Sequence, residues 1–259
     1  MQNQNRKWSR EETILAFELY CRTPYGRINS SNKEINELAV LLGRTTSAVV
    51  MKMVNLGSFD PRQRERNVSG LKNASKQDEL VFNEFYKDLE KLSYNASNIR
   101  KEYGQVIPEE ELLLNDYMLQ IPGRYKEQSV KVLIGQSFFR KAVLAAYDNK
   151  CCITGISNTK LLIASHIKPW SESDNGIERT NPCNGLCLNA LHDRAFDQGL
   201  LTIDYNYRII LSSKIKTVDM NIETKDWFLS FAGKQISLPD RFLPAKEIIK
   251  YHNENIFEP

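Results

Sequence analysis

The sequence lacks the features that mark several large classes of protein. Its apolar runs all fall short of the ~18 residues that a bilayer-spanning helix needs, and its first ten residues are polar, without the apolar core of a signal peptide. Cysteine is scarce and odd in number, with five in 259 residues, which argues against a disulfide scaffold. We therefore expect a cytoplasmic protein with reduced thiols and no membrane segment.

Neither sign of charge dominates the sequence. The 35 Lys and Arg residues exceed the 32 Asp and Glu residues by only three, which permits an anionic partner without indicating one. A content of 41% hydrophobic and 26% charged residues is typical of a folded globular chain, and this length suffices for two domains. Any indication of function must come from local patterns.

Three short helices are predicted near the N-terminus. The Ser9–Glu12 and Ser31–Glu34 segments have the form of capping boxes, and a turn at Gly43 separates the second helix from the third. Two helices joined by a short glycine-containing turn are typical of the helix-turn-helix motif. We therefore predict a DNA-binding module over residues 1–66, with residues 45–56 as the recognition helix. The alternative is a three-helix domain that only packs.

Basic residues in and after this module favour contacts with phosphate. Arg44 and Lys52 are the candidates at the turn and the recognition helix, and the run Arg62, Arg64 and Arg66 follows them, although acidic residues show that the module is not uniformly basic. The segment Gly43–Asn55 also resembles the N-terminal region of some bacterial HNH-type restriction endonucleases.

The middle of the chain contains no recognisable catalytic or metal-binding motif. Residues 67–75 are typical of a linker, and Ser75 can cap a helix that begins a helical connector over residues 67–128. A further helix is predicted at Phe138–Tyr147, with Arg140 facing outward. After Cys151 short apolar runs alternate with turn residues, which predicts a strand, a loop, a second strand, a helix and a hairpin.

An ordered series of polar residues overlies this last pattern. His166, Asn184, the pair His192-Asp193 and Asp197 occur in that order within about 32 residues. In this series the sequence resembles the HNH endonuclease family, in the branch common among bacterial restriction and defence proteins, over about residues 136–213. The resemblance implies a ββα-metal nuclease domain, which we place at residues 129–259. The expected fold class is α+β, with a helix-turn-helix-like N-terminal module, a helical connector and this C-terminal domain.

The residue types suit the hydrolysis of a phosphodiester. A neutral imidazole can accept a proton from water near pH 7, and His166 at the end of an apolar strand fits that role of general base. Asp193 and Asp197 are four residues apart on one helix face, where their carboxylates can hold a divalent cation that stabilises the developing charge. His192, next to them, remains a candidate as a metal ligand or catalytic residue.

The resemblance adds three expectations. It implies that Asn184 is a catalytic-site residue that orients the general base. Relatives commonly carry Asp or His immediately before the general base, where this sequence has Ser165, a weak ligand. Many relatives hold a structural zinc on two Cys-x-x-Cys pairs, but Thr154 and Ala190 interrupt both pairs here, so no structural zinc is expected and the cysteines are interpreted as small apolar residues of the core.

The sequence therefore predicts an endonuclease that cuts double-stranded DNA with Mg²⁺, Mn²⁺ or another divalent cation. A homodimer is expected because cutting two strands with single-metal sites usually calls for two active sites. The natural setting by resemblance is restriction or anti-phage defence in a bacterial cytoplasm. The alternatives are a non-catalytic DNA-binding or regulatory protein that retains an HNH scaffold, which Ser165 favours, and a nuclease specific for RNA or for a nucleic-acid structure. The candidate nucleic-acid contacts, with a solvated charged surface as their alternative, are Lys168, Arg179, Arg194, Arg140, Arg44 and Lys52.

Overall fold

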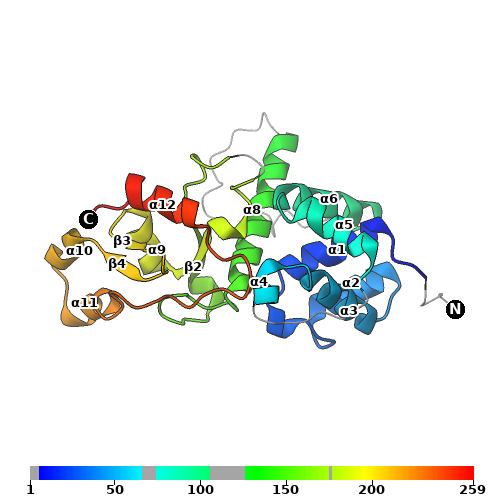
Figure 1. Ribbon diagram of the computed structural model, residues 1–259, viewed down its shortest axis with the longest axis horizontal. Coiled ribbons are helices and arrows are strands. Elements are labelled where there is room, and N and C mark those ends of the chain that lie inside the picture. Colours follow the sequence, from blue (N-terminus) through cyan, green and yellow to red (C-terminus); the bar gives the residue numbers. More distant parts are fainter. Residues whose placement is uncertain (1–5, 66–73, 106–125, 175–176) are drawn as a thin grey trace.

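The computed structural model describes residues 6–65, 74–105, 126–174 and 177–259. Figure 1 shows a helical lobe formed by the N-terminal part of the chain and a second lobe that contains the strands, with the long helix α8 between them. Arg66, most of the predicted linker and the later part of the predicted connector lie outside the described residues. No helix in the described ranges is long and apolar enough to cross a bilayer.

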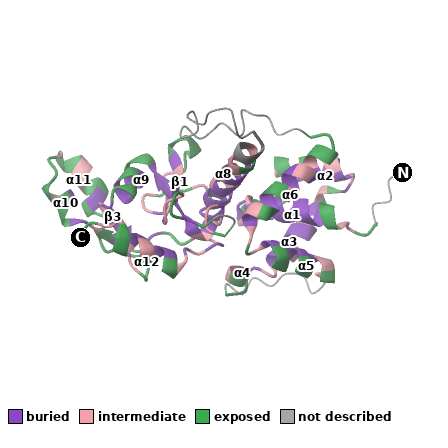
Figure 2. Ribbon diagram, turned by 90° about the horizontal axis from the view of Figure 1, so that it is seen from above, coloured by how far each residue is buried: buried purple, intermediate pink, exposed green. Residues whose placement is uncertain are grey.

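The helical lobe is built around its first helix. Every residue of α1 from Glu12 to Cys21 is buried, and Figure 2 shows this helix in the middle of the lobe. Burial on all sides is typical of a central helix, which must be covered by its neighbours. The described elements of the lobe are α1 (Arg10–Cys21), η1 (Tyr25–Arg27), α2 (Lys33–Leu42), α3 (Thr46–Gly57), α4 (Pro61–Glu65), α5 (Lys76–Phe85) and α6 (Leu89–Glu102).

Local capping explains where these helices begin. As predicted, Ser9 and Ser75 cap α1 and α5, and both form capping boxes. Thr45 accepts a hydrogen bond from the third backbone N–H of α3. Gly43 ends α2 in the left-handed conformation at a φ of 61°, which favours glycine. The predicted Ser31 cap is wrong by one residue, because the Asn32 side chain accepts the free N–H groups of α2 instead.

The predicted connector is not separate from the predicted N-terminal module. Both α5 and α6 pack against α1, and the rings of Phe17 and Phe82 lie 5.1 Å apart. The apolar faces of α5 and α6 therefore complete the core around α1, and residue 66 does not mark a boundary in packing.

The basic side chain of the predicted recognition helix and that of the residue before it both point inward. The Arg44 guanidinium lies 2.7 Å from Glu12 and stacks 4.2 Å from the Trp8 ring centroid, and the Lys52 ammonium lies 2.5 Å from Asp78. All four charged groups are buried. The assignment of Arg44 and Lys52 to phosphate contacts is therefore wrong, because both cations are paired inside the helical lobe.

The outer face of α3 offers no charge in their place. The exposed residues of α3 are Ser47 and Met51, both uncharged. The helix, turn and helix are present as secondary structure, but this face lacks the cations that usually anchor a recognition helix to DNA.

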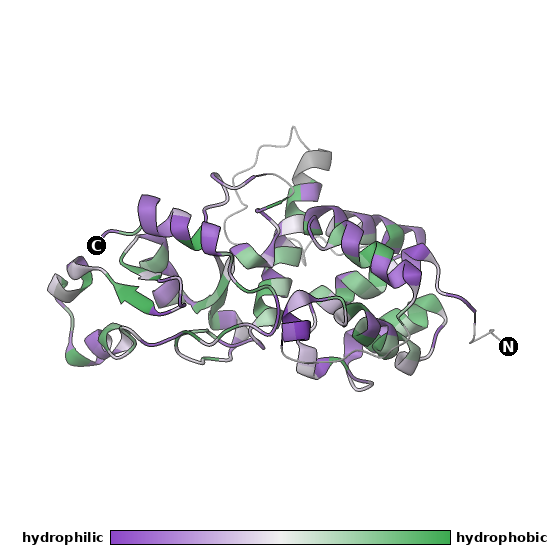
Figure 3. Ribbon diagram, viewed as in Figure 1, coloured by the Kyte–Doolittle hydropathy of each residue, from purple (hydrophilic) through white to green (hydrophobic). Residues whose placement is uncertain are grey.

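The second lobe contains two small antiparallel sheets. In the first, β1 (Leu162–His166) pairs with β2 (Gly185–Asn189), with Leu162 opposite Asn189 and His166 opposite Gly185. In the second, β3 (Leu201–Ile203) pairs with β4 (Ile209–Leu211). Figure 3 shows β4 in hydrophobic colours and much of α12 in hydrophilic ones. The other elements are α8 (Lys126–Ala146), η2 (Thr159–Leu161), η3 (Pro182–Asn184), α9 (Ala190–Asp197), α10 (Ser213–Thr217), α11 (Ile222–Leu229) and α12 (Lys246–Asn255).

Helix α8 joins the lobes because it packs against α1 and α6 on one side and β1 and β2 on the other. It begins well before the predicted Phe138 and runs through Gly135, where added Cβ would lie only 2.7 Å from the Thr180 side chain. The glycine is therefore a site of close packing and does not end the helix.

One arginine from the second lobe is buried in the first. Arg241 has no exposed surface, and its guanidinium donates hydrogen bonds to the carbonyl oxygens of Tyr20 and Thr23 at the C-terminal end of α1. Its Nε also lies 3.0 Å from Asp240. Cations are favourable at a helix C-terminus, where carbonyl oxygens have no partner within the helix. The two lobes therefore share a buried polar contact.

Candidate active site

The site is framed by β1, β2 and α9 and backed by α8. Gly185 begins β2 where that strand crosses α8, and a Cβ added there would lie 2.4 Å from Val143. The absence of a side chain thus allows β2 to approach α8 closely. Asn189 then caps α9 by accepting from the N–H groups of Leu191 and His192, so the chain passes directly from strand to helix.

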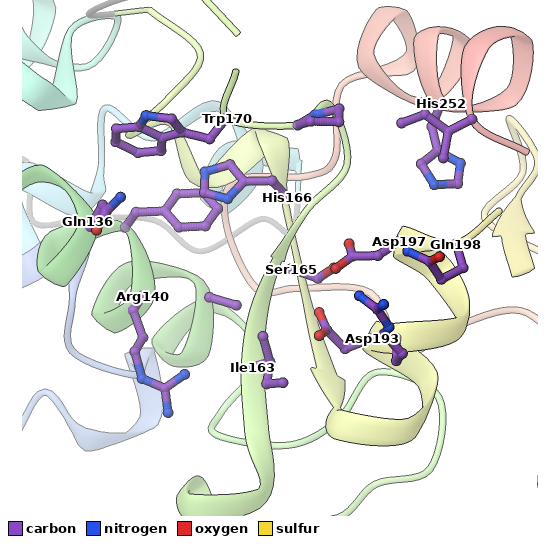
Figure 4. Close-up of a pocket in the computed structure, with 15 residues that line it drawn as sticks. Gln136, Arg140, Ile163, Ser165, His166, Trp170, Asp193, Asp197, Gln198 and His252 are labelled. Atoms are coloured by element: carbon purple, nitrogen blue, oxygen red, sulfur yellow. The ribbon is translucent and has the colours of Figure 1, made fainter. Parts of the chain in front are cut away.

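A cavity of about 590 Å³ opens at this junction. Figure 4 shows His166 near its centre, the carboxylates of Asp193 and Asp197 on one side, and Gln136 and Trp170 on the other. The described residues that line it are Gln136, Phe139, Arg140, Ile163, Ala164, Ser165, His166, Pro169, Trp170, Asp193, Arg194, Asp197, Gln198, His252 and Ile256.

His166 is held between aromatic rings with a defined tautomer. It is the last residue of β1, and its ring stacks on Phe139 and meets Trp170 edge-on. Its Nε2 lies 2.9 Å from the carbonyl oxygen of Arg179. Because a carbonyl only accepts, Nε2 carries the proton and Nδ1 holds the lone pair. Burial lowers the pKa of His166 to about 4, so the imidazole is neutral at pH 7.

Asn184 ties together the chain on either side of the site. Its Oδ1 accepts from the Lys168 N–H at 2.8 Å, and its Nδ2 donates to the Lys168 carbonyl at 3.1 Å and the Ser173 hydroxyl at 3.2 Å. The side chain is fully buried. These bonds fix the segment that directly follows His166 to the start of β2.

The two carboxylates of α9 form an unneutralised pair. Burial raises the pKa of Asp193, an effect opposed by the nearby Ser165 hydroxyl and the Arg194 charge. Asp197 is exposed as a residue, but partial desolvation of its carboxyl group raises its pKa to about 6, and the charge of Asp193 adds to this rise. Neither carboxylate has an ion-pair partner within 4 Å among the described residues. Bringing a cation to this pair would relieve their repulsion.

This donor set fits a hard divalent cation. Mg²⁺ is usually bound by one or two carboxylates together with waters and substrate phosphate, so Asp193 and Asp197 suffice as protein ligands. The buried Ser165 Oγ makes no hydrogen bond of standard geometry within the described chain and faces the same site. The described residues contain no cluster of three or more His, Cys, Asp or Glu side chains that could hold a metal, which distinguishes this site from a closed zinc centre.

The structure does not bring His192 to the cavity. The residue is fully buried, its Nε2 donates to the Trp227 carbonyl at 2.8 Å, and its Nδ1 lies 2.8 Å from the Asn189 side chain. Asn189 in turn donates to the sulfur of Cys151. With both ring nitrogens bonded to protein groups, His192 has no free lone pair for a metal or proton, and its assignment to catalysis and metal binding is corrected to a structural role in the core.

The basic residues predicted to contact nucleic acid differ in whether their charge is already paired within the protein. Lys168 is paired with Glu178 at 2.7 Å, and Arg179 donates to the Ser173 carbonyl and lies over the Trp170 ring. Arg140 donates to two neutral carbonyls, those of Leu162 and Thr159, so its charge is not cancelled by those bonds.

Arg194 is exposed and lines the cavity. It makes no side-chain hydrogen bond or ion pair within the described ranges. Arg194 and Arg140 are therefore the two cations best placed to meet a phosphate at the cavity.

Nine of the described cavity residues had not been singled out from the sequence, among them an amide, two aromatic rings and an imidazole. Gln136 and Phe139 come from α8, Trp170 from the loop after β1, and His252 from α12. The sequence held one indication for Phe139, because it lies four residues before the apolar Val143 and residues at this spacing share a helix face. In the structure both side chains lie against Gly185. The distance of His252 from the motif along the chain gave no such signal.

Comparison with known proteins agrees with the geometry of the strands and helix. Residues 151–204 match the family model of the HNH endonucleases, a span that contains β1, β2, α9 and β3. This match confirms the resemblance to the HNH endonuclease family that the order of His166, Asn184 and Asp193 indicated.

Matches beyond this family model are few. No curated protein matches the chain. A solved structure described as "Modification dependent TagI restriction endonuclease" resembles part of it, with 18% sequence identity, a TM-score of 0.29, and coverage of 46% of this chain and 37% of that one. The similar region thus spans little more than a third of that enzyme.

Proposed function

We propose that the protein is a divalent-metal-dependent endonuclease that hydrolyses phosphodiester bonds in DNA. The observation that carries this proposal is the position of a neutral imidazole in one cavity with two unneutralised carboxylates. A restriction or anti-phage role, action on double-stranded DNA, a homodimer and a cytoplasmic location belong to the same proposal and rest on resemblance to the family.

His166 acts as the general base in this proposal. Its Nε2–H is held by the Arg179 carbonyl, so its Nδ1 lone pair is the one that can accept a proton from the attacking water. Asn184 acts as a positioning residue, since it fixes the loop that follows the base.

Asp193 and Asp197 are the proposed ligands of Mg²⁺ or Mn²⁺. When bound, such an ion supplies positive charge to a phosphate oxygen and to the departing oxygen. Arg194 and Arg140 add positive charge at the cavity and are the proposed phosphate contacts. Since Arg44 and Lys52 are buried in ion pairs, the proposal does not depend on the helical lobe for binding phosphate.

Cleavage of a supercoiled plasmid tests this function. Methylated and unmethylated plasmids are incubated with the purified chain in Mg²⁺, Mn²⁺ or EDTA, and His166→Ala prepared in parallel controls for contaminating nuclease. We expect nicked or linear plasmid only when Mg²⁺ or Mn²⁺ is present, and a cleavage rate lower by about 10²-fold or more in His166→Ala. Cleavage by that variant at the wild-type rate would contradict the proposed base. Absence of cleavage by the wild type on every substrate would favour a non-catalytic scaffold.

A further inference from the structure

The cavity continues beyond the groups that the proposed hydrolysis needs. The carboxylates lie on one side of His166, whereas Gln136 and Trp170 lie on the other, as Figure 4 shows. A volume of about 590 Å³ is in the range of pockets that enclose an organic ligand. The side away from the carboxylates is here called the indole side and is defined by Gln136, Phe139, Pro169 and Trp170.

Trp170 gives the indole side an aromatic surface beside the proposed base. Its ring meets His166 edge-on, with centroids 5.6 Å apart and planes at 87°, and the Arg179 guanidinium lies 5.4 Å from the ring centroid. The residue is only partly buried and lines the cavity. Aromatic faces of this kind stack on nucleobases, and an adjacent arginine adds attraction for the same ligand.

Gln136 adds an unused hydrogen-bond acceptor. Its Oε1 is buried and has no hydrogen-bond partner among the described residues, although the residue lines the cavity. A buried polar atom without a hydrogen-bond partner destabilises the fold, so a ligand N–H that donates to this oxygen would gain binding free energy. A phosphate has no N–H, so this acceptor does not suit the backbone of DNA. All four nucleobases carry N–H donors on their pairing edges.

We infer that the indole side binds a nucleobase next to the phosphodiester bond that is cut. The base stacks on Trp170 and donates an N–H to Gln136, while its phosphate faces His166 and the carboxylates. This inference rests on the proposed function for the phosphate but adds a substrate class. A base inserted in this way has left its helical stack, so a DNA duplex must be locally unpaired next to the bond that is cut.

Binding without metal tests the inference independently of cleavage. A fluorescent oligothymidylate of about 12 nucleotides is compared, in EDTA, with an abasic strand of the same length and charge. We expect the wild type to bind the base-bearing strand about tenfold more tightly than the abasic strand, which is the scale of one stacked base. Trp170→Ala and Gln136→Leu should reduce this ratio toward one, and Trp170→Phe should retain part of it.

Matched controls separate a lost ligand contact from a lost fold. Trp227→Phe changes another partly exposed tryptophan of the same lobe and should leave the ratio unchanged. Trp170→Phe keeps an aromatic ring against His166, so its melting temperature should stay close to that of the wild type. Equal affinity of the wild type for the two strands would overturn the inference, as would an unchanged ratio in both Trp170→Ala and Gln136→Leu. A chain that discriminates between the strands but cuts no plasmid would refute the nuclease proposal alone.

Discussion

The ring of His166 lies face to face on the ring of Phe139, with centroids 3.8 Å apart and planes within 10° of each other. This contact covers one face of the proposed base with apolar surface and disfavours its protonated form. Phe139 therefore influences the charge of His166 without a hydrogen bond to it.

Replacement of that ring should change the titration of His166. In Phe139→Leu we expect the pKa of His166 to rise from about 4 toward its ordinary value of 6.5, because the imidazole becomes more hydrated. An NMR pH titration checks this. His192 and His252 serve as internal controls, because their described ring contacts are with other aromatic residues. An unchanged His166 titration would show that other groups bury it.

The stability of the folded chain should decrease as the pH falls from 6.5 toward 4. Burial lowers the pKa values of His166 and His252 to about 4 each and also lowers that of His192. The unfolded chain then binds more protons in this window, so the free energy of unfolding decreases, by up to about 3 kcal/mol for each of the first two imidazoles.

Asp197 acts in the opposite direction. Its pKa is raised to about 6, so the folded chain takes up this proton first and gains stability as the pH falls through 6 toward 3.8. Asp193, whose pKa is also raised by burial, acts in the same direction as Asp197. Because three imidazoles oppose these two carboxyl groups, we expect a net loss of stability. Urea unfolding at pH 7, 6 and 5 measures the balance, and a curve that rises toward pH 5 would contradict this prediction.

Removal of the charge of Asp197 should stabilise the metal-free protein and weaken metal binding. At neutral pH Asp197→Asn ends its repulsion with Asp193, and we expect a gain of about 1 kcal/mol, limited by solvent screening of this exposed carboxylate. Thermal unfolding in EDTA measures the gain. Calorimetric titration with Mn²⁺ should show weaker binding in both Asp197→Asn and Asp193→Asn.

The exposed Asp219 provides the control, since Asp219→Asn lies outside the cavity and should change neither quantity. Mn²⁺ affinity equal to that of the wild type in both site variants would show that the carboxylates of α9 are not the metal ligands.

Arg44 should affect folding and not the salt dependence of DNA binding. Arg44→Ala leaves Glu12 buried without this partner, and we expect a loss of about 3 kcal/mol or more in the free energy of unfolding. Urea unfolding measures this loss, and the exposed Lys33→Ala is the matched control, with little effect expected. A stable Arg44→Ala protein with weaker, less salt-dependent DNA binding would instead restore the predicted phosphate contact.

Local patterns predicted the nuclease domain well because its elements follow short-range rules. The apolar runs before His166 and after Asn184 became β1 and β2, and the spacing of Asp193 and Asp197 placed both carboxylates at one cavity. Capping residues such as Ser9 and Thr45 lie next to the groups that they bond, so they too can be identified from sequence.

Long-range contacts account for what the sequence did not predict. The partners of Arg44 and Lys52 lie 32 and 26 residues away, so neither ion pair is visible in a local pattern of charge. His192 has the residue type of a ligand, but the Trp227 carbonyl that occupies its Nε2 is 35 residues away. The same limit concealed the packing of α5 and α6 on α1.

The contact of Arg241 with α1 can form only late in the synthesis of this protein. The carbonyl groups of Tyr20 and Thr23 are made early, but the guanidinium that covers them is added more than 200 residues later. Until then the end of α1 lacks a partner that the finished fold supplies. The helical lobe therefore reaches its final form only after the nuclease motif has been translated, and a chain interrupted between the two is incomplete in both lobes.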